Sequence, residues 1–94
     1  MNKIKYFEKE ISYIKDKTRQ EDIKYLINLL PDYFFKIPAS STGKYHPKFA
    51  STEHGLVKHT KVAVRIAYDL FEINEIFTND DKDLIIMALI MHDG

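Results

Sequence analysis

The sequence contains no cysteine, and its 94 residues carry no net charge. Without cysteine there can be no disulfide framework, thiolate metal site or cysteine nucleophile, so histidine, carboxylate and hydroxyl groups must do any chemistry. Fourteen basic side chains balance fourteen acidic ones, which argues against non-specific nucleic-acid binding. The sequence also lacks an apolar run of the roughly 20 residues that a membrane span needs. We therefore expect a cytoplasmic protein without a membrane partner.

The two halves of the chain differ in charge although the whole is neutral. Residues 1–50 hold ten Lys and Arg against six Asp and Glu, a net charge of +4, whereas residues 51–94 hold four against eight, a net charge of −4. A basic half beside an acidic half suits phosphate contacts next to a cation site. The same asymmetry also arises from ordinary solvated faces.

Proline and glycine are scarce, and all three prolines fall between residues 31 and 47. On both sides of that segment apolar residues recur at helical spacing, which predicts N-terminal helices in 1–30 and two further helices in 56–94. We expect a single all-α domain, a small bundle of about four helices with an ordered loop over 31–55. Five aromatic side chains are expected to hold this loop on the core: Tyr33, Phe34, Phe35, Tyr45 and Phe49.

Local signals predict where the helices begin and which faces point inward. Thr18 followed by Glu21 has the spacing of a capping box, and Asn79 or Asp80 can cap the last helix. The inward stripe of the third helix is expected to comprise Leu56, His59, Val62, Ala63, Ile66, Ala67 and Leu70. The inward stripe of the last helix is expected to comprise Ile85, Ala88, Leu89 and His92.

Two histidines stand on these expected inward faces. A lone histidine on an apolar face is more often a hydrogen-bonded core residue than a ligand. His59 and His92 come from separate helices, however, and a divalent cation shared between them would satisfy both imidazoles. Asp93 follows His92 and can reach the edge of the same pocket, because adjacent residues lie about 100° apart on a helix. The residues alone leave both the core and the metal interpretation open.

Three stretches resemble a known family. "GLVKHT" at residues 55–60, followed by "HD" at 92–93 at the end of a later apolar helix, resembles the HD-domain metal-dependent phosphohydrolases. "SSTGKYHP" at residues 40–47 resembles the lead-in of a bacterial and phage branch of that superfamily. The resemblance covers about residues 38–94. It implies that His59, His92 and Asp93 bind a divalent metal, which could be Mn, Fe, Ni, Zn or Mg.

The same resemblance implies a reaction and a departure from the family pattern. His92 and Asp93 would take part in hydrolysis of a nucleotide or another phosphate ester. The family's last ligand is a distant Asp, and this sequence ends at Gly94. We therefore expect an enzyme that is incomplete as it stands, either a fragment or one completed by pairing of two copies. The alternative is a catalytically inactive HD-like module that binds a protein partner, or itself, through an open apolar face formed by Met87, Leu89, Ile90 and Met91.

Several basic side chains are candidates for contacting the substrate's phosphate. "STGKY" is not a nucleotide-binding phosphate loop, because Pro38 stands where a glycine is required and Tyr45 follows Lys44. A single lysine or histidine still suits a phosphate as a point charge, although each of these residues also fits ordinary surface charge. The substrate-binding candidates are Lys44, His46, His54 and Lys58, with Lys61 and Arg65 further along the same helix.

Overall fold

The computed structural model describes residues 1–37 and 55–92, and all regular structure within these two ranges is helical. The expected all-α fold is therefore confirmed. The remaining residues, including Asp93 and the greater part of the expected loop, lie outside the described ranges. The elements are the 3-10 turn η1 (Ile4–Phe7), α1 (Glu8–Ser12), α2 (Lys17–Leu29), the 3-10 turn η2 (Asp32–Phe35), α3 (Gly55–Ile73) and α4 (Asn79–Met91).

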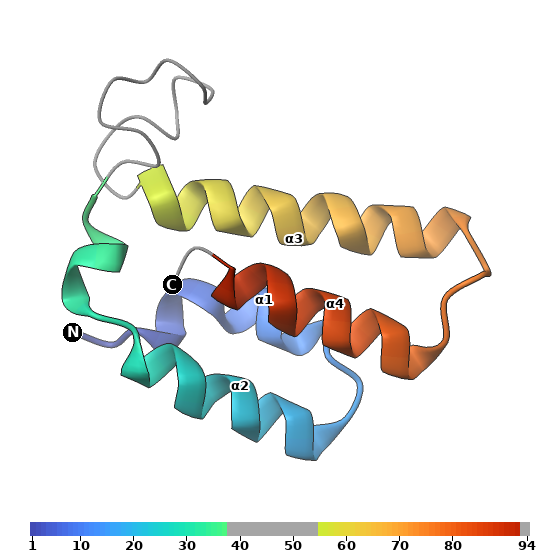
Figure 1. Ribbon diagram of the computed structural model, residues 1–94, viewed down its shortest axis with the longest axis horizontal. Helices are drawn as coiled ribbons and strands as arrows, with labels where there is room; N and C mark the ends of the chain where they lie inside the picture. The colour runs from blue at the N-terminus through green and yellow to red at the C-terminus, as the bar shows by residue number, and fades with distance from the viewer. Residues whose placement is uncertain (38–54, 93–94) are drawn as a thin grey trace.

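Helices α3 and α4 form an antiparallel pair that packs on the N-terminal helices (Figure 1). Only residues 74–78 separate the two helices, and so short a connection makes α4 return along α3. The beginning of α3 and the end of α4 consequently lie at the same end of the molecule. Element η2 packs beside the start of α3, where the Leu56 backbone N–H donates to the carbonyl oxygen of Ile37 at 3.0 Å.

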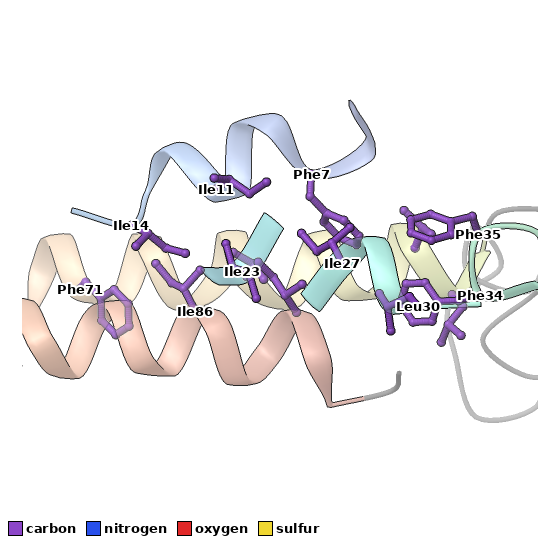
Figure 2. Close-up of a cluster of buried hydrophobic side chains, with 14 residues drawn as sticks. Phe7, Ile11, Ile14, Ile23, Ile27, Leu30, Phe34, Phe35, Phe71 and Ile86 are labelled. Atoms are coloured by element: carbon purple, nitrogen blue, oxygen red, sulfur yellow. The ribbon is translucent and has the colours of Figure 1, made fainter. Parts of the chain in front are cut away.

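The core is a row of aliphatic and aromatic side chains from every element (Figure 2). Phe34 and Phe35 pack edge to face with ring centroids 5.2 Å apart, and both are buried as expected. Tyr33 is exposed, so its assignment as a core anchor is wrong. Three successive residues of one 3-10 turn point in directions about 120° apart, and they cannot all face the same core.

Helix α2 is capped by Asp16, two residues before the predicted cap Thr18. The carboxylate of Asp16 accepts hydrogen bonds from the backbone N–H groups of Thr18 at 2.8 Å and Arg19 at 3.2 Å. Thr18 therefore lies inside the first turn, and the predicted box between Thr18 and Glu21 is wrong. An aspartate in extended backbone conformation just before the first turn satisfies the same orphan donors.

Helix α4 does begin with a capping box, but one residue before the predicted cap. The hydroxyl of Thr78 accepts from the Asp81 backbone N–H at 3.0 Å, and the Asp81 carboxylate accepts from the Thr78 N–H at 3.1 Å. Asn79 and Asp80 are thus the first residues of the helix rather than its cap. The reciprocal pair satisfies two backbone donors at once.

Helix α3 is rotated relative to the predicted orientation. Its sequence holds two apolar stripes of the same spacing, and periodicity alone cannot choose between them. Thr60 belongs to the buried stripe because its hydroxyl donates to the Leu56 carbonyl at 3.0 Å, which satisfies the hydroxyl internally. The buried residues of α3 are Gly55, Leu56, Val57, Thr60, Val64 and Phe71. Three residues of the predicted inward stripe are exposed instead: Val62, Ile66 and Leu70.

Helix α4 is also rotated, and a buried carboxylate explains why. Its buried residues are Asp83, Ile86 and Ile90, whereas Ala88 and His92 of the predicted stripe are exposed. The Asp83 side chain, 1% exposed, accepts from the backbone N–H groups of Lys15 at 2.8 Å and Asp16 at 3.1 Å. The Arg19 guanidinium lies 3.4 Å from the same carboxylate. These contacts join α4 to the turn before α2.

The expected open apolar face at the end of α4 is not found. Ile90 is buried, and Met87, Leu89 and Met91 are half-buried against the core. Several exposed apolar side chains lie on α3 instead, which follows from the rotation of that helix.

We predict that Asp83→Asn lowers the free energy of unfolding by about 2 kcal/mol, because one buried acceptor becomes a donor that faces a backbone N–H. Urea unfolding followed by circular dichroism measures the change. Asp80→Asn is the matched control: Asp80 also pairs with Arg19, at 2.8 Å, but is largely exposed. Its replacement should cost under about 0.5 kcal/mol. Equal losses in both variants would contradict the role given to Asp83.

Candidate functional site

His59 lies in the second turn of α3, at the edge of the face that meets α4. Its side chain is half-buried, whereas the preceding residue, Lys58, is exposed and the following one, Thr60, is buried. The internal hydrogen bond of Thr60 and the burial of Val57 and Val64 fix which way this turn faces. His59 is thereby held at the boundary between core and solvent, where an imidazole keeps access to a ligand.

His92 follows the last residue of α4, and its ring is oriented by a local hydrogen bond. The Nδ1 atom lies 2.6 Å from the carbonyl oxygen of Leu89. Because a carbonyl oxygen only accepts, Nδ1 carries the proton, and in the neutral ring the lone pair is on Nε2. Metal-binding histidines commonly donate their second ring N–H to a backbone carbonyl in this way.

The two imidazoles are brought together by the antiparallel pairing of α3 and α4. Their ring centroids are 6.2 Å apart, with an angle of 51° between the ring planes. Two imidazoles sharing one tetrahedral ion, with N–metal distances of about 2.1 Å, have their centroids roughly 5 Å apart. The observed pair is about 1 Å wider, a difference that small side-chain rotations remove. The donor chemistry of His59 and His92 suits a divalent cation, and sharing one ion would require the two rings to approach by about 1 Å.

The third predicted ligand, Asp93, lies outside the described residues, as do Lys44, His46 and His54. Among residues 1–37 and 55–92 there is no group of three or more histidine, aspartate or glutamate side chains that could hold a metal ion. The described part of the candidate site is thus the histidine pair together with the exposed Lys58.

Lys61, two residues after His59, is engaged elsewhere. Its Nζ atom lies 2.7 Å from the Glu10 carboxylate, donates to the Tyr6 carbonyl oxygen, and stands 5.7 Å from the centroid of the Phe7 ring. Glu10 is 1% exposed, and a carboxylate so deeply buried requires a cationic partner. Lys61 therefore joins α3 to the N-terminal segment, and it is not placed to meet a substrate phosphate.

Arg65 is likewise turned toward the N-terminal segment. Its hydrogen bond to Tyr13 raises the pKa of the guanidinium. Tyr13 in turn stacks on Tyr68, with ring centroids 3.9 Å apart. Arg65 stays exposed, and of the three basic candidates on α3 Lys58 is the one next to His59 in the sequence.

Sequence reasoning missed the two buried carboxylates that orient the site, Glu10 and Asp83. Both carried a recognisable signal. Glu10 lies three residues after Phe7 within a buried helical stripe, and Asp83 lies three before Ile86. A charged residue at core spacing predicts a buried ion pair or a group of backbone donors around it.

No protein-family model, curated protein or solved structure matches this chain. The resemblance to the HD-domain phosphohydrolases therefore rests on the sequence motifs alone. None of the helices in residues 1–37 and 55–92 has both the length and the apolar character required to cross a membrane.

We predict that Lys61→Met destabilises the fold by about 3 kcal/mol, because it leaves the Glu10 carboxylate buried without its cation. Lys58→Met on the same helix is the matched control and should change stability by under about 0.5 kcal/mol. Adding Glu10→Gln to Lys61→Met should recover a substantial part of the loss. Chemical denaturation of the unmodified chain, Lys61→Met, Lys58→Met and the double variant gives the free energy of unfolding of each. A double variant no more stable than Lys61→Met alone would contradict the pairing of Lys61 with Glu10.

Proposed function

We propose that this chain is a metal-dependent phosphohydrolase domain of the HD type, acting on a nucleotide or another phosphate ester. The observation that supports this most strongly is the approach of His59 and His92, whose ring centroids are 6.2 Å apart although 33 residues separate them in the sequence. Both belong to the motifs on which the resemblance rests. The antiparallel pairing of α3 and α4 brings the two motifs to the same end of the molecule.

In this proposal His59 and His92 supply two nitrogen ligands for a divalent cation, and Asp93 supplies an oxygen ligand. The hydrogen bond from His92 Nδ1 to the Leu89 carbonyl holds the ring in the tautomer that ligation through Nε2 needs. When bound, the cation supplies Lewis-acid chemistry, acidifying a water and withdrawing charge from the phosphoryl group. The half-buried position of His59 limits solvent on one side of the site.

Lys58 is the described residue best placed to attract the substrate. It is exposed and precedes His59 directly in α3. An ammonium group on a flexible stem can contact a phosphate without a fixed angle. Lys44, His46 and His54, which precede it in the sequence, are proposed to contribute further contacts to the same phosphate.

The proposal predicts that the chain binds about one divalent cation through its histidine pair. Titration with Mn²⁺ and Zn²⁺ by isothermal calorimetry should give a binding isotherm for the unmodified chain. Affinity should fall at least tenfold in His59→Ala and in His92→Ala, since each removes a ligand. Lys58→Ala is the control, because it should keep the metal affinity and weaken only the binding of phosphate-bearing ligands.

Phosphatase assays with nucleotides and with a chromogenic phosphate ester then test the reaction. Activity should require added metal and should be lost in both histidine variants. A folded chain that binds neither Mn²⁺ nor Zn²⁺, or that binds them unchanged in both variants, would contradict the proposal. That result would favour the alternative of a catalytically inactive helical module.

A further inference from the structure

Helix α3 carries a row of exposed apolar side chains on the side turned away from its core-facing residues, in angular line with the half-buried His59. Val62 is 39% exposed, Ile66 56%, Leu70 48% and Ile73 77%. Their spacings of four, four and three residues keep them within a sector of roughly 80° on the helix surface. This row, the α3 stripe, runs along most of the length of the helix. Contiguous apolar surface of this kind is a common mark of an association site.

Charged residues accompany the α3 stripe on one side only. Successive helix residues are about 100° apart, so the four charged residues of this flank all lie about 60–120° from Ile66, in the same direction around the helix axis. This is the side of α3 that faces Tyr13 and the N-terminal segment, since Arg65 and Tyr68 both contact Tyr13. The exposed charged residues of this flank are Lys58 and Arg65 in its first half and Asp69 and Glu72 in its second. The flank on the other side of Ile66 holds Ala63, Ala67 and Asn74.

This distribution of charge is complementary to itself in one orientation. A two-fold axis that pairs two α3 helices face to face and antiparallel sets the charged flank of one against the charged flank of the other. The basic half then meets the acidic half of the second copy. A parallel pair would set the charged flank against the uncharged one instead, and would gain no such contacts.

We propose that the α3 stripe is a self-association surface, on which a second copy of this chain packs antiparallel about Ile66. In that register Val62 lies opposite Leu70 of the other copy, and Ile66 lies opposite itself. Arg65 comes within two residues, or about 3 Å along the axis, of the position level with Asp69 across the interface. Lys58 likewise lies two residues from the position level with Glu72 of the second copy. Charged pairs flanking an apolar seam fix orientation in paired helices by this means.

The charge pattern distinguishes this occupant from a lipid surface. An interfacial helix on an anionic membrane carries Lys and Arg along its polar flanks. Here half of the flank is acidic, so an anionic surface would be repelled by Asp69 and Glu72. A second copy offers an acidic partner to Lys58 and Arg65 and a basic partner to Asp69 and Glu72.

The first experiment is sedimentation velocity of the chain over a range of concentrations at low and high salt. We expect the apparent mass to approach twice the monomer mass as concentration rises. Ile66→Glu should weaken self-association at least tenfold, since it places two carboxylates at the centre of the interface. Leu29→Glu is the matched control: Leu29 is similarly exposed, at 63%, but lies on α2. It should leave the association unchanged.

A charge-exchange experiment tests the antiparallel orientation. Arg65→Glu alone and Asp69→Lys alone should each weaken self-association severalfold, because each sets like charges against one another across the two-fold axis. An equimolar mixture of the two variants should restore it. In the mixed pair the introduced glutamate of one chain meets the introduced lysine of the other, and the unchanged Asp69 meets the unchanged Arg65. Effects within one helix cannot produce this recovery on mixing.

Three outcomes would overturn the proposal. The chain could remain monomeric at all concentrations. It could associate equally well with Ile66→Glu, which would place the interface elsewhere. Or the mixed charge variants could fail to recover, which would exclude the antiparallel register. Circular dichroism of each variant ensures that a loss of association is not a loss of fold.

Discussion

Two buried carboxylates determine how the helices of this protein are turned. Asp83 accepts hydrogen bonds from the turn before α2 and thereby sets the rotation of α4. Glu10 pairs with Lys61 and thereby sets the rotation of α3. Apolar packing alone leaves the rotation of such helices poorly determined, because both carry apolar side chains on more than one face. A buried charge admits few orientations, since any other would leave it without partners.

The position of the candidate site follows from these two contacts. With Val57, Val64 and Phe71 directed into the core, His59 comes to the edge of α3 that borders α4. With Asp83 inward, His92 lies on the opposite side of α4, since nine residues span about 180° beyond two full turns. The histidines therefore meet at the rim of the helix pair rather than in the core. The pair is partly open to solvent, since His92 is exposed and His59 half-buried.

The helical fold and the histidine pair could be predicted from the sequence, but the buried faces of α3 and α4 could not. The helical class and the pairing of the two histidines followed from spacing and motif. The inward stripes of α3 and α4 were wrong because each helix offers two apolar sets at equal period, and the choice depends on contacts with residues as distant as Glu10 and Lys15. The caps were misplaced by one or two residues because several Asp, Asn and Thr side chains compete at each helix start. Tyr33 was assigned to the core by composition alone, without the geometry of its turn.

The packing of α3 on α4 holds the imidazoles of His59 and His92 together before any ligand binds. The most direct test is a nuclear Overhauser measurement between the two rings in the isotope-labelled, metal-free chain. We expect a direct cross-peak between their ring protons, since the centroids are 6.2 Å apart, and a weaker one in Asp83→Asn, where α4 loses its hydrogen bonds to the turn before α2. Clear contacts from each ring to its own helix, with no cross-peak between the rings, would show that the packing of α3 on α4 does not hold the two imidazoles together.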